Sequence, residues 1–425
     1  MPVEIATGGG LGSNVSFITD VAPVAYMDCC EPSGLCVCGE GCGCGDECGC
    51  GDTCGCGGGK GKNKKPNPCA ASHKGVFYAN DFSYLEKDRS SQCLGDCMKQ
   101  MPMGHGTVDI GGQLRLRYHH EEGMGRQAGA SGFQGTKNDF MLTRLRLYLN
   151  YKANDWLRFY VEGISAEALA NDAYIPRPID RNSGDFLNLF FDAGLTESTT
   201  FRIGRQELLY GAQRAISPLD WGNTRRTFEG VNVIYKGDDW DVDGFYTHYV
   251  PVSPFDLDEA DYKQAFYGVY ATYKSGKTAI YDLFYIGYDN TNSYTGAAPA
   301  INAANAGTAD FSLHTFGGRI FSDKGDWLFE LEGAYQTGRQ SGLGLDHRAG
   351  MCTCGVGRKL GDAWSPVLWA YYDYASGNDE ADGVYNRYNQ LFPLAHKYLG
   401  FIDAVARSNV SAPNCLLTMK PTDKL

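Results

Sequence analysis

The chain has 425 residues, among them 55 glycines, 27 tyrosines and 21 phenylalanines, and its formal net charge is −12. No stretch approaches the ~18 consecutive apolar residues of a membrane-spanning helix, and the acidic balance argues against nucleic acid as a partner. A membrane protein built from strands fits this composition, because a barrel strand needs only ~10 residues and carries polar side chains on its inward face.

The first 105 residues differ from the rest of the chain and show no sustained periodicity. Thirteen of the sixteen cysteines precede residue 98, and the tract CVCGEGCGCGDECGCGDTCGCG at 36–57 repeats with a period of six. We therefore expect a disordered, low-complexity arm and linker rich in cysteine and glycine at 1–105, followed by a folded unit at 106–425.

Three interpretations of the cysteine tract stay open. Recurring Cys-x-Cys pairs resemble thiolate clusters, which hold zinc or Cu(I). Outside the cytoplasm such thiols would instead oxidise to disulfides or crosslinks, and a flexible tether is the third reading. The candidate metal ligands are Cys36, Cys38, Cys42, Cys44, Cys48, Cys50, Cys54 and Cys56. Elsewhere the sequence predicts no cofactor.

From residue 107 onward, apolar and polar residues alternate in short segments, which is the pattern of β-strands. In 107–119, Leu114 and Leu116 fall on one face, and Arg115 and Arg117 fall on the other. The next segment repeats this division, again with leucines opposite arginines. One face of each strand is therefore apolar and the other is strongly charged.

About thirteen such strands follow one another, with a fourteenth, incomplete one near the end of the chain, and tight connections alternate with long ones. The tight connections, such as LTES, GDD and SDKGD, are rich in turn-forming residues. An antiparallel up-and-down transmembrane β-barrel sorts its loops in this way, whereas a soluble Greek-key sandwich does not. The predicted spans are 107–119, 139–152, 157–168, 185–194, 199–210, 227–236, 240–250, 263–274, 278–288, 310–322, 327–337, 345–359 and 364–374.

Arginines are concentrated where the interior of this barrel is expected. An arginine that faces lipid at mid-depth costs ~2–4 kcal/mol, so strand arginines have to point inward or to the rim. Rings of guanidinium groups favour anions and match the geometry of carboxylates. The residues expected to line the pore are Arg115, Arg117, Arg144, Arg146, Arg158, Arg202, Arg205, Arg214, Arg225 and Arg226.

Acidic residues are expected mainly outside the strands, in segments such as DLDEAD at 256–261 and NDEAD at 378–382. The negative total charge would then be compatible with a basic interior. Asp241 and Asp243 are exceptions, since alternation turns both toward the interior, where they could pair with the arginines.

Two motifs in the arginine-rich region carry a family resemblance. The pattern R-x-GRQEL-x-YG-x-QR, followed by PLDW-x-NTRR-x-F-x-GV, resembles the alginate-export family of bacterial outer-membrane barrels, and so does NQLFPLAHKYLGFIDAVARSN at 389–409. The resemblance covers about residues 107–425. It implies an eighteen-stranded barrel with an arginine-lined pore that passes a polyuronate, and it places Arg202, Arg205, Arg214, Arg225 and Arg226 at that pore.

The sequence departs from this family in strand number. About 14 strands fit into the chain, and its last residues, TMKPTDKL, lack an aromatic terminal residue. At roughly 23 residues per strand, four further strands would need ~90 residues. We therefore expect the barrel to be truncated at the C-terminus.

These features predict an outer-membrane channel of a Gram-negative-type bacterium that passes anionic solutes, uronate polysaccharide such as alginate among them. Its partners would be outer-membrane lipid, the anionic solute and a periplasmic export partner. No HExxH, GxSxG or phosphate-binding loop is present, so no enzymatic role is expected. The alternative is a membrane-anchored structural or metal-binding protein whose cysteine-rich arm is the active part.

Overall fold

The fold is a single curved antiparallel sheet, seen in a computed structural model. The structure describes residues 72–87, 93–122, 137–170, 177, 179–292, 310–378, 383–394, 396–400 and 405–421. None of the helices within these ranges is long and apolar enough to cross a membrane.

Sixteen strands make up the sheet, and the helices of the described residues have three or four residues each. The strands are β1 (Met101–Met103), β2 (Gly106–Glu122), β3 (Lys137–Lys152), β4 (Leu157–Ala170), β5 (Asn182–Gly194), β6 (Thr199–Gln206), β7 (Thr227–Lys236), β8 (Trp240–Val250), β9 (Gln264–Tyr273), β10 (Ile280–Asn290), β11 (Phe311–Ser322), β12 (Trp327–Gln340), β13 (Leu345–Lys359), β14 (Val367–Ala375), β15 (Val384–Tyr385) and β16 (Val410–Thr418). The helices are η1 (Phe77–Ala79), α2 (Tyr84–Lys87), η2 (Asp96–Met98) and α3 (His396–Leu399).

All thirteen predicted spans correspond to observed strands, β2 to β14, and the fourteenth is β16. The largest difference is at β6, which ends at Gln206 instead of residue 210 because the chain turns into the interior there. The two further strands, β1 and β15, are too short to carry an alternating pattern. The expected additional strands that would complete an eighteen-stranded barrel stay a prediction.

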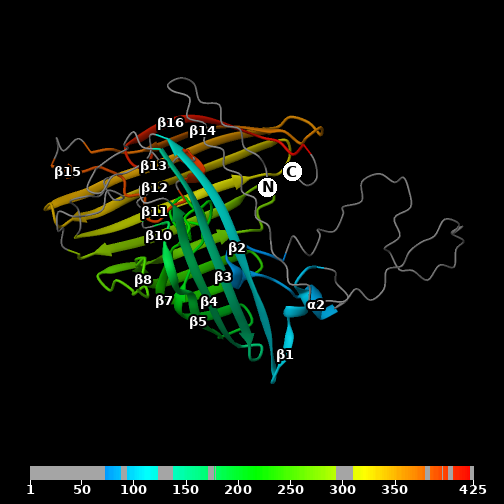
Figure 1. Ribbon diagram of the computed structural model, residues 1–425. Helices are drawn as coiled ribbons and strands as arrows, with labels where there is room; N and C mark the ends of the chain where they lie inside the picture. The colour runs from blue at the N-terminus through cyan, green and yellow to red at the C-terminus, as the bar shows by residue number, and fades with distance from the viewer. Residues whose placement is uncertain are drawn as a thin grey trace, which may run out of the picture.

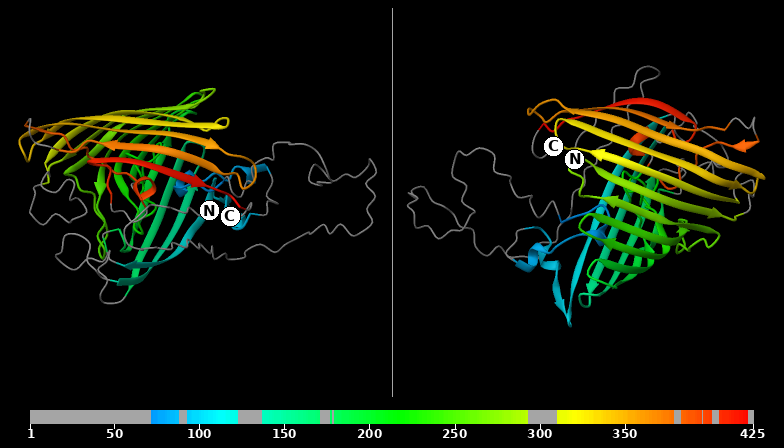
Figure 2. Two further views of the ribbon diagram at one scale, coloured as in Figure 1. Left: turned by 90° about the horizontal axis from the view of Figure 1, so that it is seen from above. Right: turned by 180° about the vertical axis from the view of Figure 1, so that it is seen from behind.

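Each strand pairs with its neighbour in sequence, in the order β1 through β14 and then β16, and these pairs are antiparallel. The short β15 adds a parallel pair with β13. Figures 1 and 2 show how the long strands curve around a common interior. This is the predicted up-and-down topology of a transmembrane β-barrel, with neighbouring strands joined alternately at the two ends.

Burial is inverted relative to a soluble protein. The outward leucines remain exposed, for example Leu147 at 59% and Leu283 at 60%, whereas the inward Arg144 and Arg146 are each 1% exposed. Lipid takes the place of water around the outward face, so apolar side chains belong there and charged ones have to pair inside. The predicted division of each strand into an apolar outer face and a charged inner face is therefore confirmed for β2 and β3.

Candidate functional site

The connection between β6 and β7, residues 207–226, folds into the interior, and we call it the inner loop. Its middle is tied to the long connection between β14 and β16. Ile216 forms a parallel bridge with Phe392, and the Ser217 N–H donates to the Phe392 carbonyl oxygen at 2.9 Å. The Phe392 N–H in turn donates to Ala215 at 3.0 Å. Two segments far apart in sequence thus occupy the interior together.

Arginines of β2 and β3 hold the far part of the inner loop. The carbonyl oxygen of Asp220 accepts from Arg115 at 2.8 Å. The carbonyl oxygen of Trp221 accepts from Arg117 at 2.7 Å, and that of Gly222 accepts from Arg144 at 3.1 Å. The Arg117 guanidinium also lies 4.0 Å from the centre of the Trp221 ring. These three predicted pore residues therefore fasten a loop inside the barrel.

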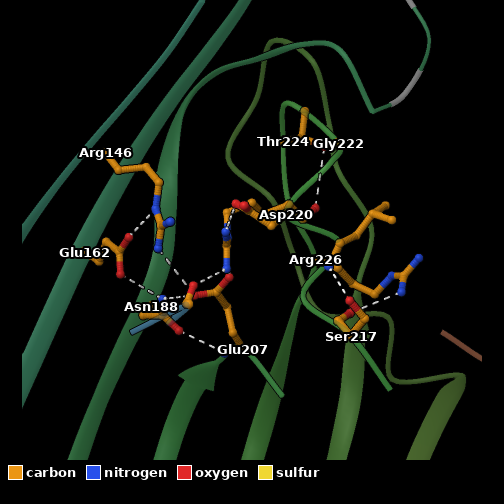
Figure 3. Close-up of polar contacts among 12 residues, drawn as sticks. Arg146, Glu162, Asn188, Glu207, Ser217, Asp220, Gly222, Thr224 and Arg226 are labelled. Carbon is orange, nitrogen blue, oxygen red and sulfur yellow. Dashed lines mark hydrogen bonds and ion pairs between the residues drawn. The ribbon is translucent and has the colours of Figure 1, made fainter. Parts of the chain in front are cut away.

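A continuous series of ion pairs connects β3 and β4 to the inner loop (Figure 3), and its members are buried except for Asp220, whose side chain is 58% exposed. Arg146 donates to Glu162 at 2.6 Å and lies 3.6 Å from Glu207. Glu207 also accepts a hydrogen bond from Arg225, which pairs in addition with Asp220. Alternating charges in this series satisfy one another, which buried ions require because removal from water is costly.

The Asn188 side-chain amide also belongs to this series, and the arginines in it act strongly on the Asp220 carboxyl. Asn188 donates to both Glu162 and Glu207, at 3.0 Å in each case. Desolvation alone would raise the pKa of the Asp220 carboxyl, but Arg225 and Arg144 beside it hold that pKa well below its usual range. Asp220 is therefore ionised across the physiological pH range.

Arginines of β4 and β6 pair directly across the sheet. Arg202 makes a two-pronged contact with Asp192, at 2.7 and 2.9 Å, and Arg158 approaches the same carboxylate at 3.4 Å. Arg205 pairs with Glu229 at 3.3 Å. The planar guanidinium and carboxylate groups match in shape, so the Arg202 pair is both strong and directional.

Arg214 reaches from the inner loop to the opposite wall of the interior. It donates to Glu330 at 2.8 Å and to Glu332 at 2.7 Å, both on β12. Arg319 of β11 shares Glu330 at 2.8 Å. Arg214 is thus neutralised by carboxylates, although the sequence alone suggests a free positive charge.

Arg226 differs from its neighbours. Its guanidinium donates to the carbonyl oxygens of Ser217 at 3.2 Å and Pro393 at 3.4 Å, and lies 5.2 Å from the Phe392 ring. Among the described residues no carboxylate lies within ion-pair distance of it. Burial lowers the pKa of Arg226 from its ordinary value, but a guanidinium stays protonated in proteins.

Asp241 and Asp243 have partners other than those expected. Asp241 lies 2.9 Å from Lys274, and Asp243 lies 3.1 Å from Lys236. Lys236 ends β7 and Lys274 follows β9, at the end of the strands where the tight turns lie. The ion pairs of both aspartates are therefore with lysines of neighbouring strand ends, while Arg202 acts on Asp243 only at longer range.

Many acidic residues lie outside the strands, as expected, but the interior also contains strand carboxylates. Strand carboxylates partner the arginines, and they are Glu162, Asp185, Asp192, Glu229, Asp282, Glu330, Glu332 and Asp373. Several of them could have been identified from the predicted strands, because they lie opposite an arginine on the neighbouring strand. Asp192 lies directly opposite both Arg158 and Arg202, and Glu229 lies opposite Arg205.

The candidate thiolate ligands Cys36 to Cys56 lie outside the described residues, so the structure does not test them. Within the described ranges no group of three or more histidine, cysteine, aspartate or glutamate side chains is placed to hold a metal ion. Cys93, which follows the tract, is disulfide-bonded.

A membrane β-barrel with charged side chains and inward-folded segments in its interior is the architecture of an outer-membrane channel. The chain belongs to the alginate-export family, because the family model described as "Alginate export" matches residues 107–425. The resemblance of the two arginine-rich motifs to this family is thereby confirmed, and the protein is an outer-membrane protein.

Solved structures similar to this chain include three outer-membrane proteins. Pseudomonas aeruginosa OccK8 (OprE) has 12% identity and a TM-score of 0.42, over 63% of this chain and 68% of that one. Acinetobacter baumannii OccAB3 has 11% identity and a TM-score of 0.36, over 63% and 82%. Salmonella typhi OmpF, in complex with daunomycin, has 10% identity and a TM-score of 0.35, over 74% of this chain and 98% of that one. No curated protein matches the chain.

Proposed function

We propose that this outer-membrane channel passes anionic solutes, with uronate polysaccharides such as alginate as the substrate class that the family suggests. The proposal assigns the chain no catalytic step. The observation that carries it is Arg226, whose described partners are carbonyl oxygens, the Tyr249 side chain and an aromatic ring. Carbonyl dipoles do not cancel its charge, so the positive potential remains available to an anion.

The ion-paired arginines have another role in this proposal. Because Arg146, Arg202, Arg214 and Arg225 contact carboxylates, they contribute little net charge and mainly hold the walls and the inner loop in place. Selectivity would then depend on Arg226. In a narrow passage of low dielectric constant, one unbalanced charge acts more strongly than it would on an open surface.

The test is the reversal potential of the purified channel in planar bilayers under a salt gradient. Arg226→Glu should reverse or abolish anion preference, while Lys263→Glu and Lys277→Glu, both at exposed positions near strand ends, should change it much less. The difference should shrink as salt rises, because the Debye length falls from ~10 Å at 0.1 M to ~3 Å at 1 M. An unchanged reversal potential in the folded Arg226→Glu variant would falsify the proposal.

A further inference from the structure

Part of the N-terminal segment lies against the interior face of the barrel. We call residues 72–82 the N-terminal plug; they precede α2, which lies beside β1 and β2 in Figure 1. Val76 is 7% exposed and Phe82 is 5% exposed. The plug rings pack on inward rings of the barrel, with Phe77 5.6 Å from Tyr148. These residues are therefore packed against the barrel wall.

The plug contacts arginines that the sequence assigns to the pore. The Arg146 guanidinium lies 3.8 Å from the centre of the Phe77 ring, and the Arg202 guanidinium lies 4.5 Å from that of Tyr78. Arg158 donates to the Tyr78 carbonyl oxygen at 2.6 Å. With Arg225, which donates to the plug as well, cation–π contacts and backbone hydrogen bonds cover four of the ten arginines predicted to line the pore.

The plug also meets the inner loop. The Tyr78 hydroxyl donates to the Glu207 carbonyl oxygen at 2.6 Å, and Arg225 donates to the Gly75 carbonyl oxygen at 3.1 Å. Arg158 and Arg202 belong to strand ends near the tight turns, so the plug lies toward that end. Two segments of the chain therefore meet inside the barrel, one before β2 and one between β6 and β7.

The stretch that joins the plug to β2 is fastened as well. Lys99 is 5% exposed, donates to the Ile110 carbonyl oxygen and contacts the Tyr148 hydroxyl at 3.0 Å. The Gln100 N–H donates to Asp109 at 2.7 Å. These contacts fix the base of the plug to β2 and β3 through residues that do not belong to the plug itself.

From these contacts we propose that the N-terminal plug closes the tight-turn mouth of the channel and has to leave before solute passes. Its contacts with the arginines use neutral groups, two aromatic rings and two carbonyl oxygens. A carboxylate binds a guanidinium more strongly than either group does, so an anionic solute competes with the plug for the same arginines. This competition rests on the proposed function, whereas closure by the plug does not.

Single-channel conductance in symmetrical potassium chloride tests closure, because that measurement is independent of ion preference. The full chain with Phe77→Ala/Tyr78→Ala should conduct several-fold more, or open several-fold more often, than the unmodified chain. The matched control, Phe255→Ala/Tyr262→Ala, removes two exposed rings from the loop between β8 and β9 and should leave the current unchanged. Equal currents in the plug variant and the unmodified chain, whether large or zero, overturn the proposal.

Hydrogen exchange of the unmodified full chain in micelles gives a second measurement that does not depend on a variant folding. The Ala79 and Asn80 amides donate within the plug, each at 3.1 Å, so the peptide covering 74–82 should exchange slowly. Exchange at the rate of an unfolded peptide overturns closure. Added polyuronate should accelerate exchange of this peptide; if it does not, competition by the solute is wrong while closure stands.

Discussion

At the scale of single residues, Glu207 has an unusual number of charged partners for a side chain that is fully buried. It contacts Arg146 and Arg225 and accepts a hydrogen bond from Asn188. Its backbone N–H also donates to Asn188 at 2.8 Å. Since each arginine depends on this carboxylate for part of its neutralisation, Glu207 joins the barrel wall to the inner loop.

Replacing Glu207 with glutamine should therefore destabilise the folded barrel strongly. Loss of one partner from a buried ion pair costs on the order of 3–5 kcal/mol, because the remaining charge stays buried without compensation. The measurement is the thermal midpoint of heat-modifiable migration on gels. Glu259→Gln, at an exposed loop position, is the control and should leave the midpoint unchanged. A midpoint for Glu207→Gln equal to the control would show that the ion pairs contribute little.

A second residue-scale prediction concerns pH. Asp258, in the loop between β8 and β9, is 7% exposed, and its N–H donates to Asp185 at 2.7 Å. Asn182 donates to its carboxylate at 2.8 Å, and Arg205 donates to its carbonyl oxygen at 2.8 Å. Burial, followed by the nearby Asp185 carboxylate, raises the pKa of Asp258 from 3.8 to about 7.

Because this folded-state pKa is above the unfolded value, the stabilising contribution of Asp258 is fully present below pH ~4 and is lost as pH rises through ~7. Between pH 5 and pH 8 the thermal midpoint of the unmodified protein should fall more than that of Asp258→Asn. The asparagine cannot ionise, so it removes this part of the pH dependence. Parallel curves for the two proteins would contradict the assignment.

At the scale of elements, the strands were predictable because side chains that face lipid alternate with side chains that face the interior. Most strands from β2 to β14 have that period of two, and tight turns such as LTES mark the ends. The inward position of most arginines followed from the same pattern. Their neutralisation by strand carboxylates did not, because it depends on the register between neighbouring strands, which alternation within one strand does not fix.

Contacts between distant, non-periodic segments could not be predicted from the sequence. Ile216 and Phe392 pair across more than half of the barrel sequence, and neither segment alternates. The plug contacts, such as Tyr78 with Glu207, join the inner loop to a region that reads as low-complexity linker. The boundary between arm and barrel near residue 105 stays a prediction, although described residues before it, such as Phe77 and Lys99, contact the barrel.

The cysteine tract gives an element-scale prediction. Deleting residues 29–57 should leave barrel folding and conductance intact, since the paired strands and the interior contacts described above are formed by residues from Ser72 onward. Heat-modifiable migration and bilayer current measure the two properties. Loss of heat-modifiable migration would show that the arm takes part in folding. Metal analysis of the reduced, isolated arm would then distinguish a thiolate cluster for zinc or copper from a tether.

At the scale of the whole molecule, tight turns lie at one end of the strands and long connections lie at the other. We expect the tight turns in the periplasm, as is usual for outer-membrane barrels. A protease-cleavable tag at Ser131 or Asn302, in the long connections, should be cut on intact cells, and one at Gly325 should not. Cleavage at Gly325 alone would reverse the orientation of the barrel.

The meeting of plug and inner loop has a consequence for biogenesis. The Gly75–Arg225 contact joins residues 150 positions apart, and the Tyr78–Glu207 contact spans 129. The plug can therefore reach its final position only after β2 to β7 have assembled and the inner loop has turned inward. Until that late step a nascent barrel would be permeable, so the order of assembly determines how long the newly inserted protein leaks.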